Sequence, residues 1–141
     1  MADNLTPERR SKNMAAIKGK DTKPEMTVRR LVHALGYRYR LHRKYLPGKP
    51  DLVFASRGKV IFVHGCFWHG CERAGCVDAR RPKSNTGYWN PKIEGNKARD
   101  QKHQRALEAM GWQVLIVWDC EIRDQPALKR RLVQFLEGDT A

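Results

Sequence analysis

The feature that most constrains the fold is a run of four apolar residues, Val60 to Val63, between Lys59 and His64. Strands with one exposed face usually alternate polar and apolar side chains. A short run that is apolar at every position is typical of a strand covered on both faces. We therefore predict that residues 59–64 form a central strand with helices packed on both sides of it.

The rest of the chain supplies those helices and a few further strands. Thr22 followed by Pro24 is a typical helix start, and apolar residues then recur at helical spacing until Gly36. Residues 65–90 are rich in Gly, Cys, Pro and Asn and are predicted to be irregular. This order predicts an α/β fold with a mixed central β-sheet flanked by helices. The predicted helices span residues 22–35, 91–110 and 125–136, and the further strands span residues 37–44, 51–54 and 112–118.

Positive charge is the first indication of function. The chain has 28 Lys and Arg against 15 Asp and Glu, and residues 1–50 alone carry 13 basic and 4 acidic side chains. The resulting net charge of +13 attracts polyanions and favours nucleic-acid binding. A basic helix or arm that contacts DNA is predicted in residues 1–20. A surface that merely keeps the protein in solution, or a ribosomal type of RNA binder, would have the same composition.

Three carboxylates stand out by their positions. Asp51 opens a strand directly after a Pro-Gly-Lys-Pro turn, and Glu25 and Asp100 lie on the apolar sides of their predicted helices. A carboxylate that faces the core needs a cation, a hydrogen-bond donor or a metal ion. Structural explanations also exist for each of them. Asp51 can cap its own turn, Glu25 can interact with the helix dipole, and Asp100 can pair with a nearby Lys or Arg.

Two histidines, His64 and His69, lie at the end of the apolar strand and in the segment after it. Ligand sites commonly form where strands end at the edge of a sheet. A histidine can act as acid or base near neutral pH, and a neighbouring carboxylate fixes its tautomer. A single histidine is usually a hydrogen-bonded core residue, but two of them beside a candidate acid favour catalysis.

Four cysteines form a further group, three of them in the irregular segment and one after the last strand. We see no secretory signal and expect a cytoplasmic protein, in which metal ligation is favoured over disulfides. Four thiolates match a closed tetrahedral zinc site, which would brace the long loop. The alternatives are four reduced thiols, or a site in which a histidine (His64, His69 or His103) replaces one cysteine. The cysteines are Cys66, Cys71, Cys76 and Cys120.

Three aromatic residues, Phe67, Trp68 and Trp89, also lie in the irregular segment. Aromatic side chains near a basic surface can wedge between base pairs and unstack them. Because a mismatched pair costs less to open than a matched one, such a wedge can confer selectivity. The alternative is that the three rings form a small core for the loop itself.

The segment from His64 to His69, which reads His-Gly-Cys-Phe-Trp-His, resembles the signature of the very-short-patch mismatch repair endonucleases. The resemblance covers nearly the whole chain in order. It implies a restriction-endonuclease-like fold with a zinc-braced loop, formed as one domain over residues 1–141. The other segments that resemble the family are residues 10–14, 21–25, 47–51, 88–100 and 111–120.

This resemblance implies an enzyme that nicks DNA on the 5′ side of T in a T:G mismatch left by deamination of 5-methylcytosine. Mg²⁺ would be held by Asp51 and the backbone carbonyl of Val63, and His69, oriented by Asp100, would activate water. The implied catalytic residues are Asp51, His69, His64, Asp100 and Glu25. The implied ligands of a structural Zn²⁺ are Cys66, Cys71, Cys76 and Cys120. The implied DNA contacts are Phe67, Trp68, Trp89, Lys12, Asn13 and Met14.

One departure concerns Val63, because the family pattern has Thr at this position. The change is tolerable if only the backbone carbonyl is used, but it should slow the reaction if a hydroxyl is needed. We expect a monomer that acts on double-stranded DNA, with mismatch-repair proteins as further partners and no membrane association. The rival interpretations are a nuclease of broader specificity and a non-catalytic, zinc-braced nucleic-acid-binding module. The module gives no reason for an inward-facing Glu25 or Asp100.

Overall fold

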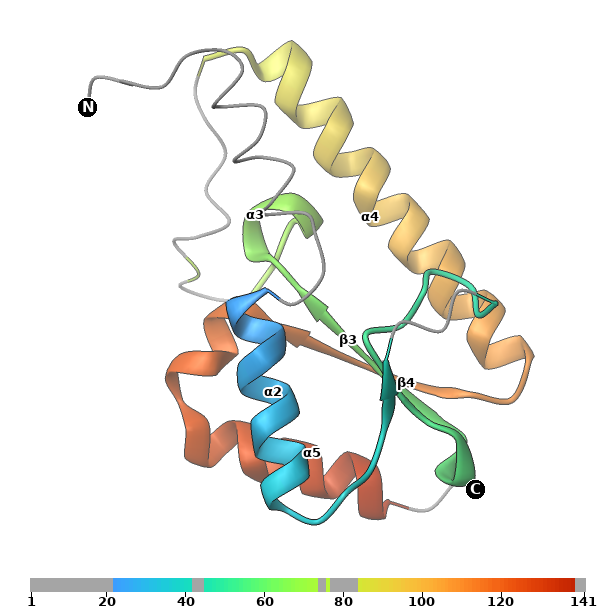
Figure 1. Cartoon of the computed structure of the whole chain (residues 1–141). Helices are drawn as coiled ribbons and strands as arrows, with labels where there is room; N and C mark the ends of the chain where they lie inside the picture. The colour runs from blue at the N-terminus through green and yellow to red at the C-terminus, as the bar shows by residue number, and fades with distance from the viewer. Residues whose placement is uncertain (1–21, 42–44, 74–75, 77–83, 139–141) are drawn as a thin grey trace.

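The computed structural model describes residues 22–41, 45–73, 76 and 84–138, and it shows a sheet between helices (Figure 1). The predicted N-terminal arm, with Lys12, Asn13 and Met14, lies outside the described residues. The helices are α2 (Lys23–Ala34), α3 (Cys66–His69), α4 (Thr86–Ala109) and α5 (Gln125–Glu137). The strands are β1 (Arg40–Leu41), β2 (Leu52–Phe54), β3 (Lys59–His64) and β4 (Gln113–Trp118).

The sheet is mixed, as predicted from the sequence, and β3 lies in its interior. The strands are arranged in the order β1-β2-β3-β4. β2 pairs antiparallel with both β1 and β3, whereas β3 and β4 are parallel, from Lys59 opposite Gln113 to His64 opposite Trp118. Parallel strands need a crossover connection, and α3 and α4 form it. The crossover places α3 at the end of β3, where the predicted site residues lie.

Side chains of the sheet alternate between two hydrophobic cores. α2 and α5 cover one face, where Ile61 belongs to a cluster with Val28 and Leu132 (Figure 1). α4 lies on the other face, where Val60 belongs to a cluster with Leu107. Because β3 contributes to both cores, it is apolar on both faces. None of the described helices is long and apolar enough to span a membrane.

Two predicted boundaries were wrong. Within the described residues, the strand predicted over 37–44 is reduced to Arg40–Leu41 at the sheet edge, with both side chains exposed. The segment 65–90 is not irregular throughout. It contains α3, and the helix α4 begins within it, at Thr86. Pro91, the predicted helix start, therefore lies inside α4. A proline inside a helix lacks the N–H that a helical hydrogen bond requires, so the sequence favours a helix start at this position.

A buried lysine attaches α5 to the start of β3. The ammonium of Lys59 donates hydrogen bonds to the carbonyl oxygens of Phe135 (2.5 Å), Leu136 (3.2 Å) and Gly138 (2.7 Å). The carbonyls at the end of a helix have no helical partners, and the helix dipole there favours a cation. Lys59 is 1% exposed, so these bonds also satisfy a charge that burial would otherwise penalise.

Candidate active site

One turn of helix brings His69 back beside His64 at the end of β3. Gly65 precedes the turn, and Gly70 ends it in the left-handed conformation with φ 64°. A Cβ atom at Gly70 would lie 2.6 Å from the side chain of Lys97 in α4, so glycine permits both the turn and this close approach. The two histidine rings consequently stack, with centroids 3.9 Å apart and planes 8° apart.

Asp100 of α4 faces this pair of histidines. Its Oδ2 lies 2.6 Å from Nδ1 of His69 and 3.9 Å from Nδ1 of His64. Within the described residues, the side chains that the structure pairs with Asp100 are thus histidines, and not the lysine or arginine of the alternative interpretation. Among the described residues, the buried Nδ1 of His64 has no hydrogen-bond partner. Burial, and then the neighbouring His69, lowers the pKa of His64 to about 3, so this ring is neutral near pH 7.

Asp51 lies between the turn and β2, next to the end of β3. Its Oδ2 accepts a hydrogen bond of 2.7 Å from the N–H of Val63, so it binds the backbone of the neighbouring strand. The N–H and C=O of one strand residue point to the same side of the strand, so the Val63 carbonyl is expected on the side of β3 that carries this hydrogen bond. Burial first, and Glu25 in addition, raise the pKa of Asp51 to about 7, against the opposing effects of the Val63 N–H and of Arg29.

Glu25 is buried near the start of α2, with an exposed fraction of 3%. Its carboxylate forms an ion pair with Arg29, one turn later on the same helix. Its own N–H lies 3.4 Å from the Thr22 side-chain oxygen that caps the helix. Glu25 therefore belongs to the first turn of the helix and also faces inward. Glu25 and Asp51 line the same cavity, and Glu25 raises the pKa of Asp51.

A single cavity of about 810 Å³ unites these side chains. α2 contributes one of them, the residue before β2 another, and the end of β3, α3 and α4 contribute the rest. Lys23, Lys49 and Arg99 line the same cavity, and their positive charge suits a phosphate ligand. The predicted catalytic residues that line it are Glu25, Asp51, His64, His69 and Asp100.

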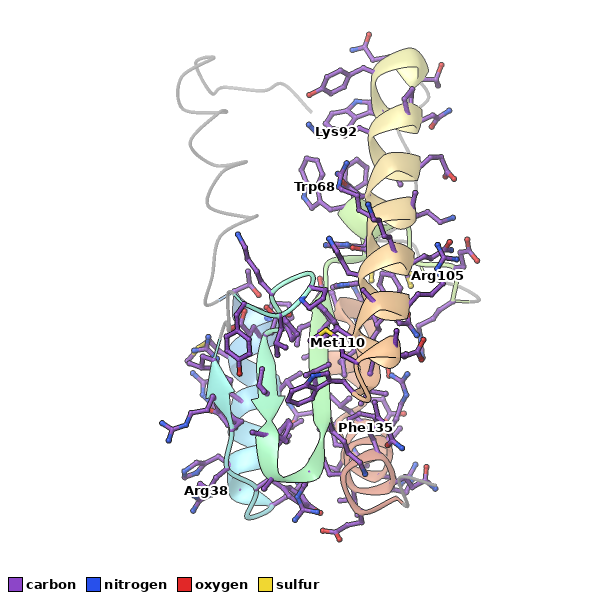
Figure 2. The ribbon with its side chains drawn as sticks, turned by 90° about the vertical axis from the view of Figure 1, so that its right-hand side faces the viewer. Arg38, Trp68, Lys92, Arg105, Met110 and Phe135 are labelled. Atoms are coloured by element: carbon purple, nitrogen blue, oxygen red, sulfur yellow. The ribbon has the colours of Figure 1, made fainter. Side chains whose placement is uncertain are left out.

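The three predicted wedge aromatics form one cluster between α3 and the start of α4. The ring centroids of Phe67, Trp68 and Trp89 lie 5.2, 5.3 and 5.8 Å apart in pairs, and each residue is half-buried. Tyr88 adds a fourth ring, 4.8 Å from Trp89. Lys92 lies over the rings of Trp68 and Tyr88, and Figure 2 shows Trp68 and Lys92 on the same side of α4. The rings pack on one another and still retain accessible surface.

The four cysteines gather in a cluster of their own, with their sulfur atoms within 4.8 Å of one another. The N–H of Cys120 points to the sulfur of Cys66 at 3.3 Å, and the sulfurs of Cys71 and Cys120 are 3.9 Å apart. Burial raises the pKa of Cys66, and that of Cys71 to about 11, so these thiols need a cation in order to ionise. The three histidines considered as alternative ligands line the cavity instead. The cysteine cluster, completed by Cys76, is compatible with a zinc site.

The sequence did not point to Asn96 or Arg99 as site residues, and it pointed to His103 only as an alternative zinc ligand. Asn96, Arg99 and His103 line the cavity together with Asp100. They lie on one face of α4, because residues three, four and seven positions apart share a face of a helix. Asn96 also donates a hydrogen bond of 2.8 Å to the Trp68 carbonyl, which connects the cavity wall to the aromatic cluster. The helical spacing of these polar residues can be seen in the sequence, but only the structure shows that they face the cavity.

Comparison with known proteins places the chain in a family. A sequence profile described as DNA mismatch endonuclease Vsr matches residues 2–74. The type II nicking enzyme V.XorIIP of Xanthomonas oryzae pv. oryzae is 55% identical over 97% of this chain and 98% of its own length. The chain belongs to the Vsr family. The resemblance seen in the segment from His64 to His69 is thereby confirmed.

Other members of the Vsr family match over similar lengths. The DNA mismatch endonuclease Vsr of Escherichia coli (strain K12) is 38% identical, over 100% of this chain and 92% of that protein. The type II nicking enzyme V.NmeAIP of Neisseria meningitidis is 42% identical, over 94% of this chain and 92% of that protein. Among solved structures, the catalytic domain of the homing endonuclease I-Bth0305I has a TM-score of 0.55 and 18% identity, over 82% of this chain and 94% of that domain. This last similarity concerns the fold, and it confirms the predicted nuclease fold with a mixed sheet.

Proposed function

We propose that this member of the Vsr family nicks duplex DNA on the 5′ side of T in a T:G mismatch, by Mg²⁺-dependent hydrolysis of the phosphodiester bond. The observation that carries the catalytic part is the 2.6 Å contact between His69 Nδ1 and Asp100 Oδ2, in a cavity that Asp51 also lines. Relatives described as a DNA mismatch endonuclease and as nicking enzymes support mismatched DNA as the substrate and cleavage of one strand. The T:G pair and the cleaved strand are what the resemblance of the segment from His64 to His69 implies. The acting unit would be one domain over residues 1–141, with the basic segment 1–20 on the DNA.

His69 is suited to accept a proton from the attacking water. An ionised carboxylate can only accept hydrogen bonds, so the proton shared with Asp100 belongs to Nδ1 of His69. This tautomer leaves Nε2 free to act as the base, and Asp100 would stabilise the charged ring that results. The stacked ring of His64 stays neutral and helps to fix the plane of His69.

The surroundings of Asp51 fit a magnesium ion, a hard cation that binds oxygen ligands and keeps several waters. The Asp51 carboxylate and the Val63 carbonyl would hold it. Burial beside Glu25 disfavours the negative charge of Asp51, and a divalent cation would offset that penalty. When bound, the ion would neutralise charge that develops on the scissile phosphate. The arrangement uses the backbone of Val63, so a valine side chain is compatible with it.

The proposal is tested with duplexes that differ at a single base pair and carry a different label on each strand. We expect MgCl₂-dependent cleavage of the T strand of the T:G duplex, immediately 5′ of T, and an intact T:A duplex. Comparable cleavage of other mismatches would instead indicate a nuclease of broader specificity. Tight mismatch binding without cleavage would favour the zinc-braced binding module. The metal-free control omits MgCl₂ from the buffer. No chelator is added, because a chelator would also remove structural zinc.

The cluster of Phe67, Trp68 and Trp89 is our candidate for the wedge that enters the DNA beside the mismatch. Stacking on a base contributes roughly 1–3 kcal/mol per ring, so Trp68→Ala should reduce the affinity for T:G DNA by about tenfold. Competition binding against T:A DNA measures how much of this loss concerns the mismatch. Tyr45→Ala is the matched control, because Tyr45 is 68% exposed and lies outside the cluster. Equal losses in both variants would rule out a specific wedge at Trp68.

The cysteine cluster would hold one structural zinc ion that joins α3 to the segment after β4. We expect one zinc per chain by elemental analysis, and loss of this zinc in Cys71→Ser. The melting temperature of that variant should fall by at least about 10 °C, because structural zinc contributes directly to folding. Cys71→His is the control, since an imidazole is also a zinc ligand and should retain the ion. A parent protein that contains no zinc, and that melts at the same temperature as Cys71→Ser, would contradict this assignment.

A further inference from the structure

A buried arginine lies beside the acidic residues of the cavity. Arg29 is 9% exposed, and its guanidinium forms an ion pair with the Glu25 carboxylate. We propose that Arg29 is a positioning residue that serves as the internal counter-ion of the metal site. It holds the Glu25 carboxylate in place when no divalent cation is bound, and its positive charge limits how tightly such a cation binds. The inference rests on the proposed Mg²⁺ site at Asp51.

The position of Arg29 on α2 is not that of an ordinary surface arginine. Glu25, Val28, Arg29 and Val32 follow the spacing of one helix face, and all four are buried. The guanidinium also contacts the sulfur of Met26 at 3.1 Å, so it lies along the helix and not in solvent. A buried charge is costly unless it is paired, which makes Arg29 and Glu25 mutually dependent. An apolar residue at position 29 would continue the core stripe but remove this ion pair from Glu25.

The charge of Arg29 lies next to the site of Asp51 as well as next to Glu25. Glu25 and Asp51 line the same cavity, and the guanidinium of Arg29 forms an ion pair with the Glu25 carboxylate. A divalent cation at Asp51 would be attracted by both carboxylates and repelled by the guanidinium. In the metal-free protein Arg29 therefore supplies part of the positive charge that the cation supplies when it is bound.

The test is thermal unfolding of Arg29→Met and the parent protein, followed by circular dichroism, in resin-treated buffer with MgCl₂ titrated at constant ionic strength. Without Mg²⁺, the variant should melt about 10 °C lower, because one partner of a buried ion pair is missing. Mg²⁺ should then raise its melting temperature more than that of the parent. If the affinity for Mg²⁺ rises tenfold, the additional increase is roughly 4 °C. A purely structural role for Arg29 would lower the stability but leave the response to Mg²⁺ unchanged.

Three further variants separate the effect of this charge from a general loss of stability. Arg30→Met removes the same charge from an exposed position next to Arg29, and it should respond to Mg²⁺ as the parent does. Arg29→Lys keeps the charge and should resemble the parent. If Arg29→Met does not fold, Glu25→Gln and Glu25→Gln/Arg29→Met provide the same comparison in the absence of the Glu25 carboxylate. Mg²⁺ should raise the melting temperature of Glu25→Gln/Arg29→Met more than that of Glu25→Gln.

An Arg29→Met response to Mg²⁺ that is equal to or smaller than the parent response would overturn the role of Arg29. The role of Arg29 would also be overturned if Mg²⁺ raised the melting temperatures of Glu25→Gln and of the double variant by the same amount. A different result bears on the enzyme as a whole. Absence of Mg²⁺-dependent nicking by the parent protein would count against the proposed function, whereas the stability comparison does not require any cleavage.

Discussion

An Asp51→Asn variant is expected to nick T:G duplexes at least about 1,000-fold more slowly than the parent, which corresponds to roughly 4 kcal/mol of lost transition-state stabilisation. Asparagine has nearly the same shape as aspartate, and its amide oxygen can still accept the Val63 N–H, so the local fold should be kept. Its neutral amide, however, is a poor ligand for Mg²⁺ compared with a carboxylate. Single-turnover nicking of a labelled duplex measures the loss.

Binding of the T:G duplex separates this role from others. Removing one negative charge from a DNA-binding cavity should not weaken DNA binding, so the affinity of Asp51→Asn should match that of the parent or exceed it. Glu108→Gln removes the same charge from an exposed position of α4 and should leave both nicking and binding unchanged. Parallel losses of nicking and of binding in Asp51→Asn would show that Asp51 supports the structure of the cavity and not the metal.

His69→Ala is expected to lower the nicking rate by about 100- to 10,000-fold, the range associated with loss of a general base. DNA binding and zinc content should be unaffected, because His69 lies with His64 and Asp100 and outside the cysteine cluster. Asp100→Asn should slow nicking as well. An asparagine can donate its amide N–H to His69 Nδ1, and it would then favour the tautomer whose proton is on Nε2.

Elemental analysis and a remote histidine provide the checks on this second expectation. His33→Ala alters an exposed histidine in the last turn of α2 and should nick as the parent does. Loss of zinc from His69→Ala would identify His69 as a zinc ligand. A rate that stays within about threefold of the parent would exclude His69 as the base, since general-base catalysis contributes far more.

Much of the layer structure was predictable because it depends on local patterns. The apolar run from Val60 to Val63 indicated a strand covered on both faces, and the structure shows that β3 contributes to a hydrophobic core on each face of the sheet. The strand predicted over 37–44 failed, because alternation describes the side chains and not whether a partner strand continues beside them. The predicted start of α4 was wrong because a proline usually marks the beginning of a helix, whereas Pro91 lies inside one.

The sequence pointed to the members of the candidate site one by one, but it did not predict which side chains each of them would contact. Asp100 had many basic neighbours in the chain, yet its Oδ2 lies 2.6 Å from His69, 31 residues away. Arg29 was overlooked, although its spacing of four residues from Glu25 is a typical ion-pair spacing on a helix. A surface pair and a buried pair have the same spacing, so burial had to be known before Arg29 gained significance.

The sequence by itself determined the central position of β3, the amphipathic faces of α2 and α5, and the residue types from which a nuclease site could be made. Only the tertiary structure decided that the histidines join Asp100 while the cysteines gather elsewhere. The physical reason is the range of the forces involved. Helical and strand periodicity reflects neighbours a few residues apart, whereas the site depends on the parallel pairing of β3 with β4 and on the crossover that carries α4 back over the sheet.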